Sequence, residues 1–82
     1  MLQEYRKRID MIDDEIVHLF VERMRLVEEI ACQKKENNLP ILDSAREQKI
    51  IDRLTHDQTD PMAGYIKTLY NTIFDLSRTH QL

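Results

Sequence analysis

Apolar residues in the first 37 positions recur with the spacing of a long amphipathic helix. Counted in sevens, they fall on two adjacent rows. One row is Leu2, Ile9, Ile16 and Ile30, with Arg23 in the remaining position, and the other is Tyr5, Ile12, Leu19 and Leu26. This repeat, held for about four heptads, is typical of the a and d positions of coiled coils. It predicts one helix from about residue 1 to about residue 36. Asn37 and Asn38 should end it, because Asn tolerates the left-handed conformation found at helix ends.

A second, shorter helix is predicted after an extended connector. Pro40 disfavours helical geometry at the residue before it, so Leu39 should leave the first helix. Ser44 and Glu47 have the spacing of a capping box, with Ser44 as the N-cap. The apolar residues that follow predict a helix over about 44–55.

A third helix is predicted over about 61–81. Pro61 suits a first helical turn, and Asp60 is the expected N-cap. The apolar face of this segment is Met62, Tyr65, Ile66, Leu69, Tyr70, Ile73 and Phe74. Ser77 and Gln81 continue that face in the last turns, so its end is polar.

The pattern therefore predicts an all-α protein with one long, one short and one medium helix, in a single domain over residues 1–82. A helix of about 36 residues is roughly 54 Å long, which is more than the rest of this chain can cover. An uncovered apolar row indicates a partner helix, most simply from an identical chain.

Composition narrows the function classes. The net charge of −3, from 12 basic and 15 acidic residues, argues against nucleic acid or an anionic membrane as the main partner. A single cysteine, Cys32, allows neither an internal disulfide nor a cysteine-based zinc site. The single Gly excludes a glycine-rich phosphate loop, and the three histidines lack metal-ligand spacing. We therefore expect no metal and no cofactor. With no long apolar run and no signal peptide, the expected location is the cytoplasm.

Three cations on the first helix are candidates for ligand binding. Arg23 interrupts an aliphatic row, and a buried arginine needs an anionic partner or ligand. Lys34 lies eleven residues further on, which returns it to within roughly 20° of the same face, about 16 Å along the axis. Arg6 lies about 25 Å from Arg23 and roughly 100° around the helix, so it can reach such a pocket only from an antiparallel second chain.

Two further polar clusters can complete a pocket. Asp43, Arg46 and Glu47 lie within one turn at the start of the second helix, and Ser77 and Gln81 lie one turn apart on the third. The combined set contains cations and hydrogen-bonding groups but no evident nucleophile. Because arginine binds carboxylates through two parallel hydrogen bonds, the set suits a small dianion. Catalysis at such a site would depend on positioning and fixed charge.

The motifs resemble those of one known family over nearly the whole chain. They are Arg6 with Ile9 and Ile12-Asp13, Leu19-x-x-Glu22-Arg23, Lys34, Pro40-x-x-Asp43-x-x-Arg46-Glu47, and Ser77-x-x-x-Gln81. In order and spacing they are similar to those of the all-helical, type II chorismate mutases. The resemblance implies a Claisen rearrangement of chorismate to prephenate, in an intertwined antiparallel helical homodimer with two equivalent sites.

The resemblance also implies roles for individual residues. Arg6 would reach a substrate carboxylate from the partner subunit, and Arg23 would hold the other carboxylate within its own subunit. Lys34 and Gln81 would donate to the ether oxygen of the breaking bond. The remaining expected substrate contacts are Asp43, Arg46 and Glu47 around the substrate hydroxyl, with Glu47 as its direct acceptor, and Ser77 near a carboxylate.

Other interpretations stay open at this point. Arg23 could set the register of a coiled coil by pairing with a glutamate of another chain. Lys34 could stabilise a helix C-terminus, and Asp43 and Glu47 could serve only as capping residues. The alternative functions are an isochorismate pyruvate lyase and a non-catalytic, anion-binding dimerisation or regulatory module.

Overall fold

The computed structural model describes all 82 residues and contains three α-helices and no strand. The helices are α1 (Leu2–Glu36), α2 (Ser44–Thr55) and α3 (Met62–Gln81). The predicted all-α class, with one long, one short and one medium helix, is confirmed. Their ends lie within one residue of the positions expected from the apolar pattern.

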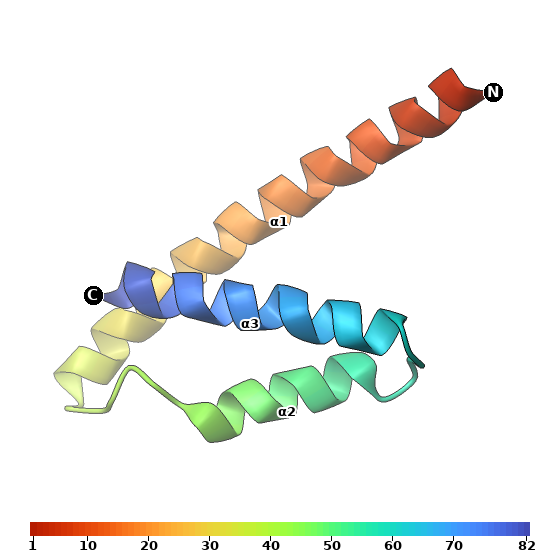
Figure 1. The fold of residues 1–82 in the computed structure, drawn as a ribbon. Coiled ribbons are helices and arrows are strands. Elements are labelled where there is room, and N and C mark those ends of the chain that lie inside the picture. The colour runs from red at the N-terminus through yellow and green to blue at the C-terminus, as the bar shows by residue number, and fades with distance from the viewer.

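The helices form an open, elongated molecule with extents of 54 × 26 × 16 Å. Helix α3 packs against both α1 and α2, whereas α1 and α2 do not approach each other closely. Only the C-terminal half of α1 takes part in this packing, and its N-terminal half projects away from the other two helices (Figure 1). No helix is both long enough and apolar enough to cross a membrane.

The core of the chain is small. Its buried apolar residues are Val27 on α1, Ile50 and Ile51 on α2, and Phe74 on α3. The rings of Tyr70 and Phe74 meet edge to face, with centroids 5.8 Å apart. Ile50, Ile51 and Phe74 form one cluster that joins α2 to α3, with Leu54 and Tyr70 packed against it.

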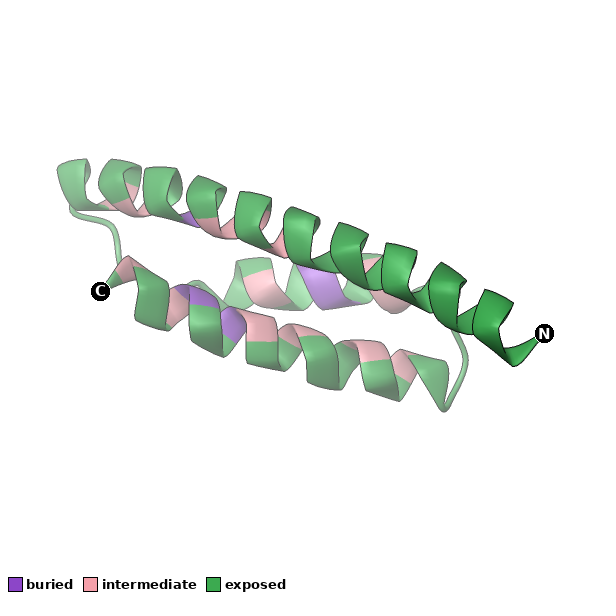
Figure 2. Cartoon of the chain, turned by 90° about the horizontal axis from the view of Figure 1, so that it is seen from above, coloured by how far each residue is buried: buried purple, intermediate pink, exposed green.

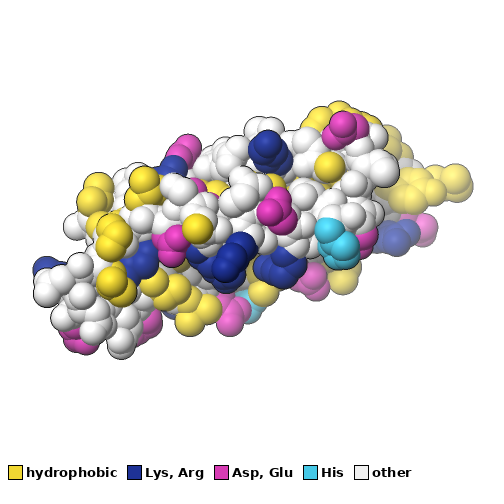
Figure 3. Space-filling view, turned by 90° about the horizontal axis from the view of Figure 1, so that it is seen from below, with side chains coloured by type: hydrophobic (Ala, Val, Ile, Leu, Met, Phe, Trp, Pro, Cys, Tyr) yellow, Lys and Arg dark blue, Asp and Glu magenta, His cyan; other side chains and the backbone are white.

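The two apolar rows of α1 remain largely uncovered. Their aliphatic and aromatic members are 49–62% exposed, and they are Leu2, Tyr5, Ile9, Ile12, Ile16, Leu19, Leu26 and Ile30. Figure 2 shows that the residues along the N-terminal half of α1 are exposed. On the face shown in Figure 3, basic and acidic side chains are interspersed rather than gathered into one basic surface. The single chain thus leaves its longest apolar surface in contact with solvent.

The N-cap of α2 differs from the prediction. Asp43, not Ser44, is the cap, and its side chain accepts a hydrogen bond of 3.0 Å from the backbone N–H of Arg46. Ser44 is already helical, and the N–H of Glu47 bonds to the carbonyl of Asp43 at 3.1 Å. The negative charge of a carboxylate at this position also interacts favourably with the positive end of the helix dipole.

The start of α3 also differs from the prediction. The expected N-cap, Asp60, does not cap the helix; Pro61 occupies the N-cap position, and no side chain forms a capping hydrogen bond. Backbone carbonyls satisfy two N–H groups there instead, since Ala63 bonds to Thr59 and Tyr65 bonds to Pro61, each at 3.1 Å. At the end of α1, the expected left-handed residue is present, because Asn38 has φ of 56°.

Candidate active site

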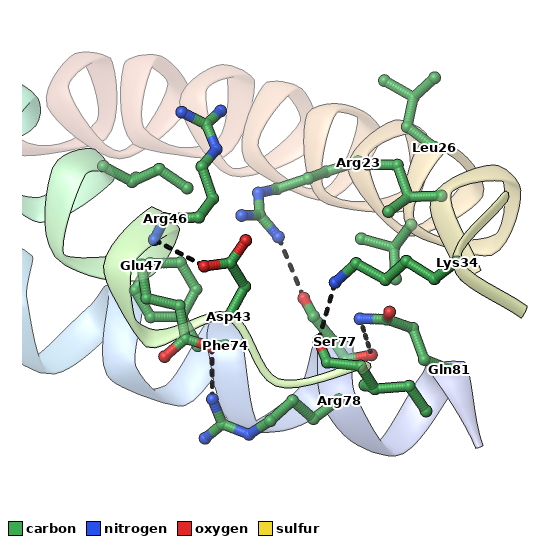
Figure 4. Close-up of a pocket in the computed structure, with 14 residues that line it drawn as sticks. Arg23, Leu26, Lys34, Asp43, Arg46, Glu47, Phe74, Ser77, Arg78 and Gln81 are labelled. Atoms are coloured by element: carbon green, nitrogen blue, oxygen red, sulfur yellow. Dashed lines mark hydrogen bonds and ion pairs between the residues drawn. The ribbon is translucent and has the colours of Figure 1, made fainter. Parts of the chain in front are cut away.

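A cavity of about 410 Å³ lies where the C-terminal half of α1, the connector, the start of α2 and the end of α3 meet (Figure 4). Seven of the eight residues predicted to bind a ligand line it, which are Arg23, Lys34, Asp43, Arg46, Glu47, Ser77 and Gln81. Most of the remaining wall is apolar, formed by Leu26, Val27, Ile30, Ile41, Ile50 and Phe74. The fold therefore brings together, at one pocket, polar groups that are up to 58 positions apart in the sequence.

Arg23 lies against α3 with its guanidinium directed into the pocket (Figure 4). Its Nη1 donates to Ser77 Oγ at 3.0 Å, and its Cζ lies 5.8 Å and 5.9 Å from the ring centroids of Phe74 and Tyr70. No carboxylate of the chain forms an ion pair with it. The aromatic faces attract the cation, but its remaining donors are available to an anion.

Ser77 and Gln81 form the polar end of α3. Ser77 is buried, accepts from Arg23 and donates to the carbonyl of Ile73 at 2.8 Å. Gln81 Nε2 donates to the carbonyl of Ser77 at 3.2 Å, while Gln81 Oε1 is buried without a hydrogen-bond partner. Each amide nitrogen carries two donors, so Gln81 keeps one N–H for a ligand.

Lys34 is held in place by the connector. Its Nζ donates to the carbonyl of Ile41 at 2.8 Å, and its own carbonyl accepts from the N–H of Leu39 at 2.7 Å. An ammonium group has three donors, so this contact leaves two for the pocket. The sequence did not predict this contact, because nothing in the residue types identifies a connector carbonyl as the acceptor of a particular lysine.

The start of α2 places two carboxylates and one cation at the other side of the pocket. Asp43 is engaged as the helix cap, and Arg46 forms no ion pair within the chain. Glu47 Oε2 pairs with Arg78 Nη1 of α3 at 2.5 Å, and Arg78 also pairs with Asp75. The hydrogen bond to Glu47 is the main cause of the raised pKa of Arg78, so this guanidinium stays charged.

Arg78 is the charged pocket residue that the sequence analysis missed. Basic residues are common in the last turn of a helix, where their charge interacts favourably with the negative end of the helix dipole. Arg78 is in such a turn, so its residue type gave no sign of a role in the site. Its position one residue after Ser77 could have indicated a place beside the site.

Positive charge exceeds negative charge in the pocket. Four cations line it, namely Arg23, Lys34, Arg46 and Arg78, against two carboxylates, Asp43 and Glu47. The pairing of Glu47 with Arg78 leaves Arg23, Lys34 and Arg46 without an ion pair in the chain. Arg23 and Lys34 are partly buried, Arg46 is exposed, and none of the three has a counter-ion in the chain, so the pocket is suited to a ligand with two negative charges.

Arg6 is not part of this pocket. It is exposed on the projecting N-terminal end of α1, at the opposite end of the helix from Lys34 (Figure 1). Within one chain the structure therefore does not bring Arg6 to the other predicted site residues. No three or more His, Cys, Asp or Glu side chains are arranged to hold a metal ion.

Comparison with known sequences identifies one family. A family model described as chorismate mutase type II matches residues 5–82. A bifunctional chorismate mutase/prephenate dehydratase of Buchnera aphidicola subsp. Schizaphis graminum is 36% identical over 78 residues, which cover 93% of this chain and 20% of that protein. A chorismate mutase of Methanocaldococcus jannaschii is 43% identical over 53 residues, which cover 65% of this chain and 54% of that protein. The chain thus spans about a fifth of the first relative and about half of the second.

Comparison with solved structures agrees with the sequence matches. A chorismate mutase of Thermus thermophilus in its form II superposes with a TM-score of 0.91 at 34% identity, covering 98% of this chain and 92% of that chain. Its form I gives a TM-score of 0.86 at 36% identity, covering 93% and 96%. The match extends over nearly the full length of both chains, so the whole three-helix arrangement is shared.

Proposed function

The chain belongs to the chorismate mutase type II family, and we propose that it is an isomerase that converts chorismate to prephenate. The observation that carries this proposal is the pocket itself. It combines an excess of two positive charges with an apolar wall and offers no Ser, Cys or His arrangement for covalent catalysis. A unimolecular rearrangement of a dianion needs no more than such a site provides.

The reaction breaks one carbon–oxygen bond and forms one carbon–carbon bond within the same molecule, without proton transfer. In the proposed mechanism, Arg23 holds one carboxylate and favours the compact conformer of the substrate in which the reacting carbons meet. Lys34 and Gln81 donate to the ether oxygen, where negative charge increases as the bond stretches. Because these interactions become stronger in the transition state than in the bound substrate, they raise kcat.

The residues from α2 are proposed to select the substrate. Glu47 accepts from the substrate hydroxyl through the carboxylate oxygen that Arg78 leaves free, and Asp43 and Arg46 lie beside it. Ser77 orients Arg23 and lies near the bound carboxylate. These assignments follow the family resemblance residue by residue, and the lining of the pocket supports them.

The functional unit is proposed to be a homodimer. The exposed apolar rows of α1 favour a second copy of the same helix, running antiparallel. Arg6 of the partner subunit would then enter the pocket and hold the second substrate carboxylate. A cytoplasmic location stays a prediction, which cell fractionation would check.

A direct assay tests the proposal. Purified protein incubated with chorismate should consume it and yield prephenate as the product. Release of pyruvate from isochorismate, with no action on chorismate, would instead indicate a lyase. Tight binding of chorismate without turnover would indicate a regulatory module, and absence of both binding and turnover would contradict a ligand site altogether.

A further inference from the structure

Arg78 links two helices at the edge of the pocket. Its Nη1 contacts Glu47 Oε2 on α2 at 2.5 Å, and its Nη2 contacts Asp75 one turn earlier on α3. The two contacts use both arms of the guanidinium fork and so fix its plane, and Figure 4 shows the contact with Glu47. The side chains of Arg78 and Glu47 are only 32% and 26% exposed, so the pair is partly shielded from water.

This pairing determines what the Glu47 carboxylate can offer. One oxygen, Oε2, is engaged by Arg78, whereas Oε1 has no hydrogen-bond partner in the chain. An ionised carboxylate is an acceptor only, so Oε1 is available to one hydroxyl donor. Arg78 itself has no spare charge for an anionic ligand, because two carboxylates already surround it.

We propose that Arg78 is a positioning residue, which holds the Glu47 carboxylate so that Oε1 faces the hydroxyl group of the substrate. This inference rests on the proposed function and extends it to a residue that does not itself touch the reacting atoms. It assigns Arg78 to substrate recognition at the hydroxyl, and not to binding of the carboxylates or the ether oxygen.

The test compares two substrates and three variants. Arg78→Met keeps most of the side-chain volume but removes the charge, Arg78→Lys keeps the charge without the fork, and Arg53→Met is the matched control on an exposed arginine without a side-chain contact. Each is assayed with chorismate and with the analogue that lacks the ring hydroxyl. Circular dichroism first establishes that each variant is folded.

With chorismate, Arg78→Met should lower kcat/KM about tenfold, mainly through a higher KM, as expected when a charge-assisted contact present in both ground and transition states is lost. With the analogue the loss should be less than about twofold, because no hydroxyl remains for Glu47 to bind. Arg78→Lys should recover part of the loss, and Arg53→Met should match the parent protein.

Equal losses on both substrates would assign Arg78 a purely structural role and overturn the inference, as would parent-like kinetics of Arg78→Met. If Arg78→Met does not fold, Arg78→Lys gives the same comparison, with a smaller loss expected on chorismate alone. In a Glu47→Gln background, Arg78→Met should have no further effect. A parent protein without turnover would instead refute the proposed function, which separates the two failures.

Discussion

Arg23 is a charged residue in a row that is otherwise aliphatic, and the structure gives it aromatic neighbours and one hydroxyl but no counter-ion. The guanidinium is half-buried, so its desolvation is only partly offset by Ser77 and the two rings. An anionic ligand would complete its environment. The same argument makes Arg23 the residue whose loss should affect catalysis most directly.

Arg23→Ala is expected to lower kcat/KM for chorismate by at least about a hundredfold, the scale seen when a preorganised electrostatic contact is removed. Arg23→Lys should restore only part of the activity, because an ammonium group cannot bind a carboxylate through two parallel hydrogen bonds. Steady-state kinetics measure both effects, and far-UV circular dichroism should show unchanged helix content. A variant that keeps parent activity would contradict the placement of substrate against Arg23.

The sequence was sufficient to predict the residues that differ chemically from their surroundings, and Arg23 among apolar residues is the clearest case. It was insufficient for residues whose partner lies elsewhere in the fold. The contact of Lys34 with the carbonyl of Ile41, and that of Arg78 with Glu47, depend on how the connector and α3 pack. Such contacts have no local sequence signal.

At the scale of the helices, α2 depends on its N-cap because it is only 12 residues long. Isolated helices of this length are marginal in water, so α2 relies on the packing of Ile50 and Ile51 and, in addition, on the hydrogen bonds at its ends. The side chain of Asp43 provides that bond, and Ser44 does not.

Asp43→Ala should therefore lower the free energy of unfolding by about 1 kcal/mol, whereas Ser44→Ala should change it by less than about 0.5 kcal/mol, as for an ordinary surface position. Urea denaturation at one fixed protein concentration measures the difference, since dimerisation would make stability depend on concentration. The opposite order, with the larger loss at Ser44, would show that the capping box predicted from the sequence forms after all.

The helices themselves could be predicted because a repeat of apolar residues over several turns constrains where a helix can lie. Their caps could not be predicted with the same success. Asp43 and Ser44 are adjacent, and both residue types favour the N-cap, so only the backbone geometry separates them. At α3 the carbonyl of Thr59 satisfies an N–H group that Asp60 was expected to satisfy.

At the scale of the whole molecule, the exposed rows of α1 are the main apolar surface that the single chain leaves uncovered. They continue as far as Ile30 on a helix whose N-terminal half projects away from α2 and α3 and has only exposed residues as far as Leu19. An apolar surface of this length on an isolated chain would favour aggregation unless another copy covers it. Association and substrate binding should therefore depend on the same helix.

Leu19→Glu should convert the proposed homodimer into monomers or unfolded chains, because it introduces a charge into the apolar row. Met11→Glu is the matched control, since Met11 is 67% exposed and lies outside both rows. Sedimentation velocity over a range of concentrations distinguishes the species. Dimers that persist in Leu19→Glu would show that these rows do not form the interface.

A mixture of Arg6→Ala and Arg23→Ala chains tests whether each site is shared. If Arg6 acts on the site of the other subunit, a mixed dimer contains one site without either substitution and one site with both. Activity of the co-refolded mixture should then rise well above that of either variant alone, towards about one quarter of the parent value for random pairing. A mixture no more active than its components would argue that Arg6 does not act in trans.

Because α1 is one unbroken helix from Leu2 to Glu36, it fixes the distance and the angle between any two of its residues. Adding or deleting one residue between Arg6 and Arg23 would rotate one arginine by about 100° relative to the other and shift it by about 1.5 Å. Inserting a whole heptad would nearly keep the angle but move the two arginines about 10 Å further apart. Length changes in relatives should therefore be tolerated in the connector and in the turn after α2, and be excluded from the interval between these two arginines.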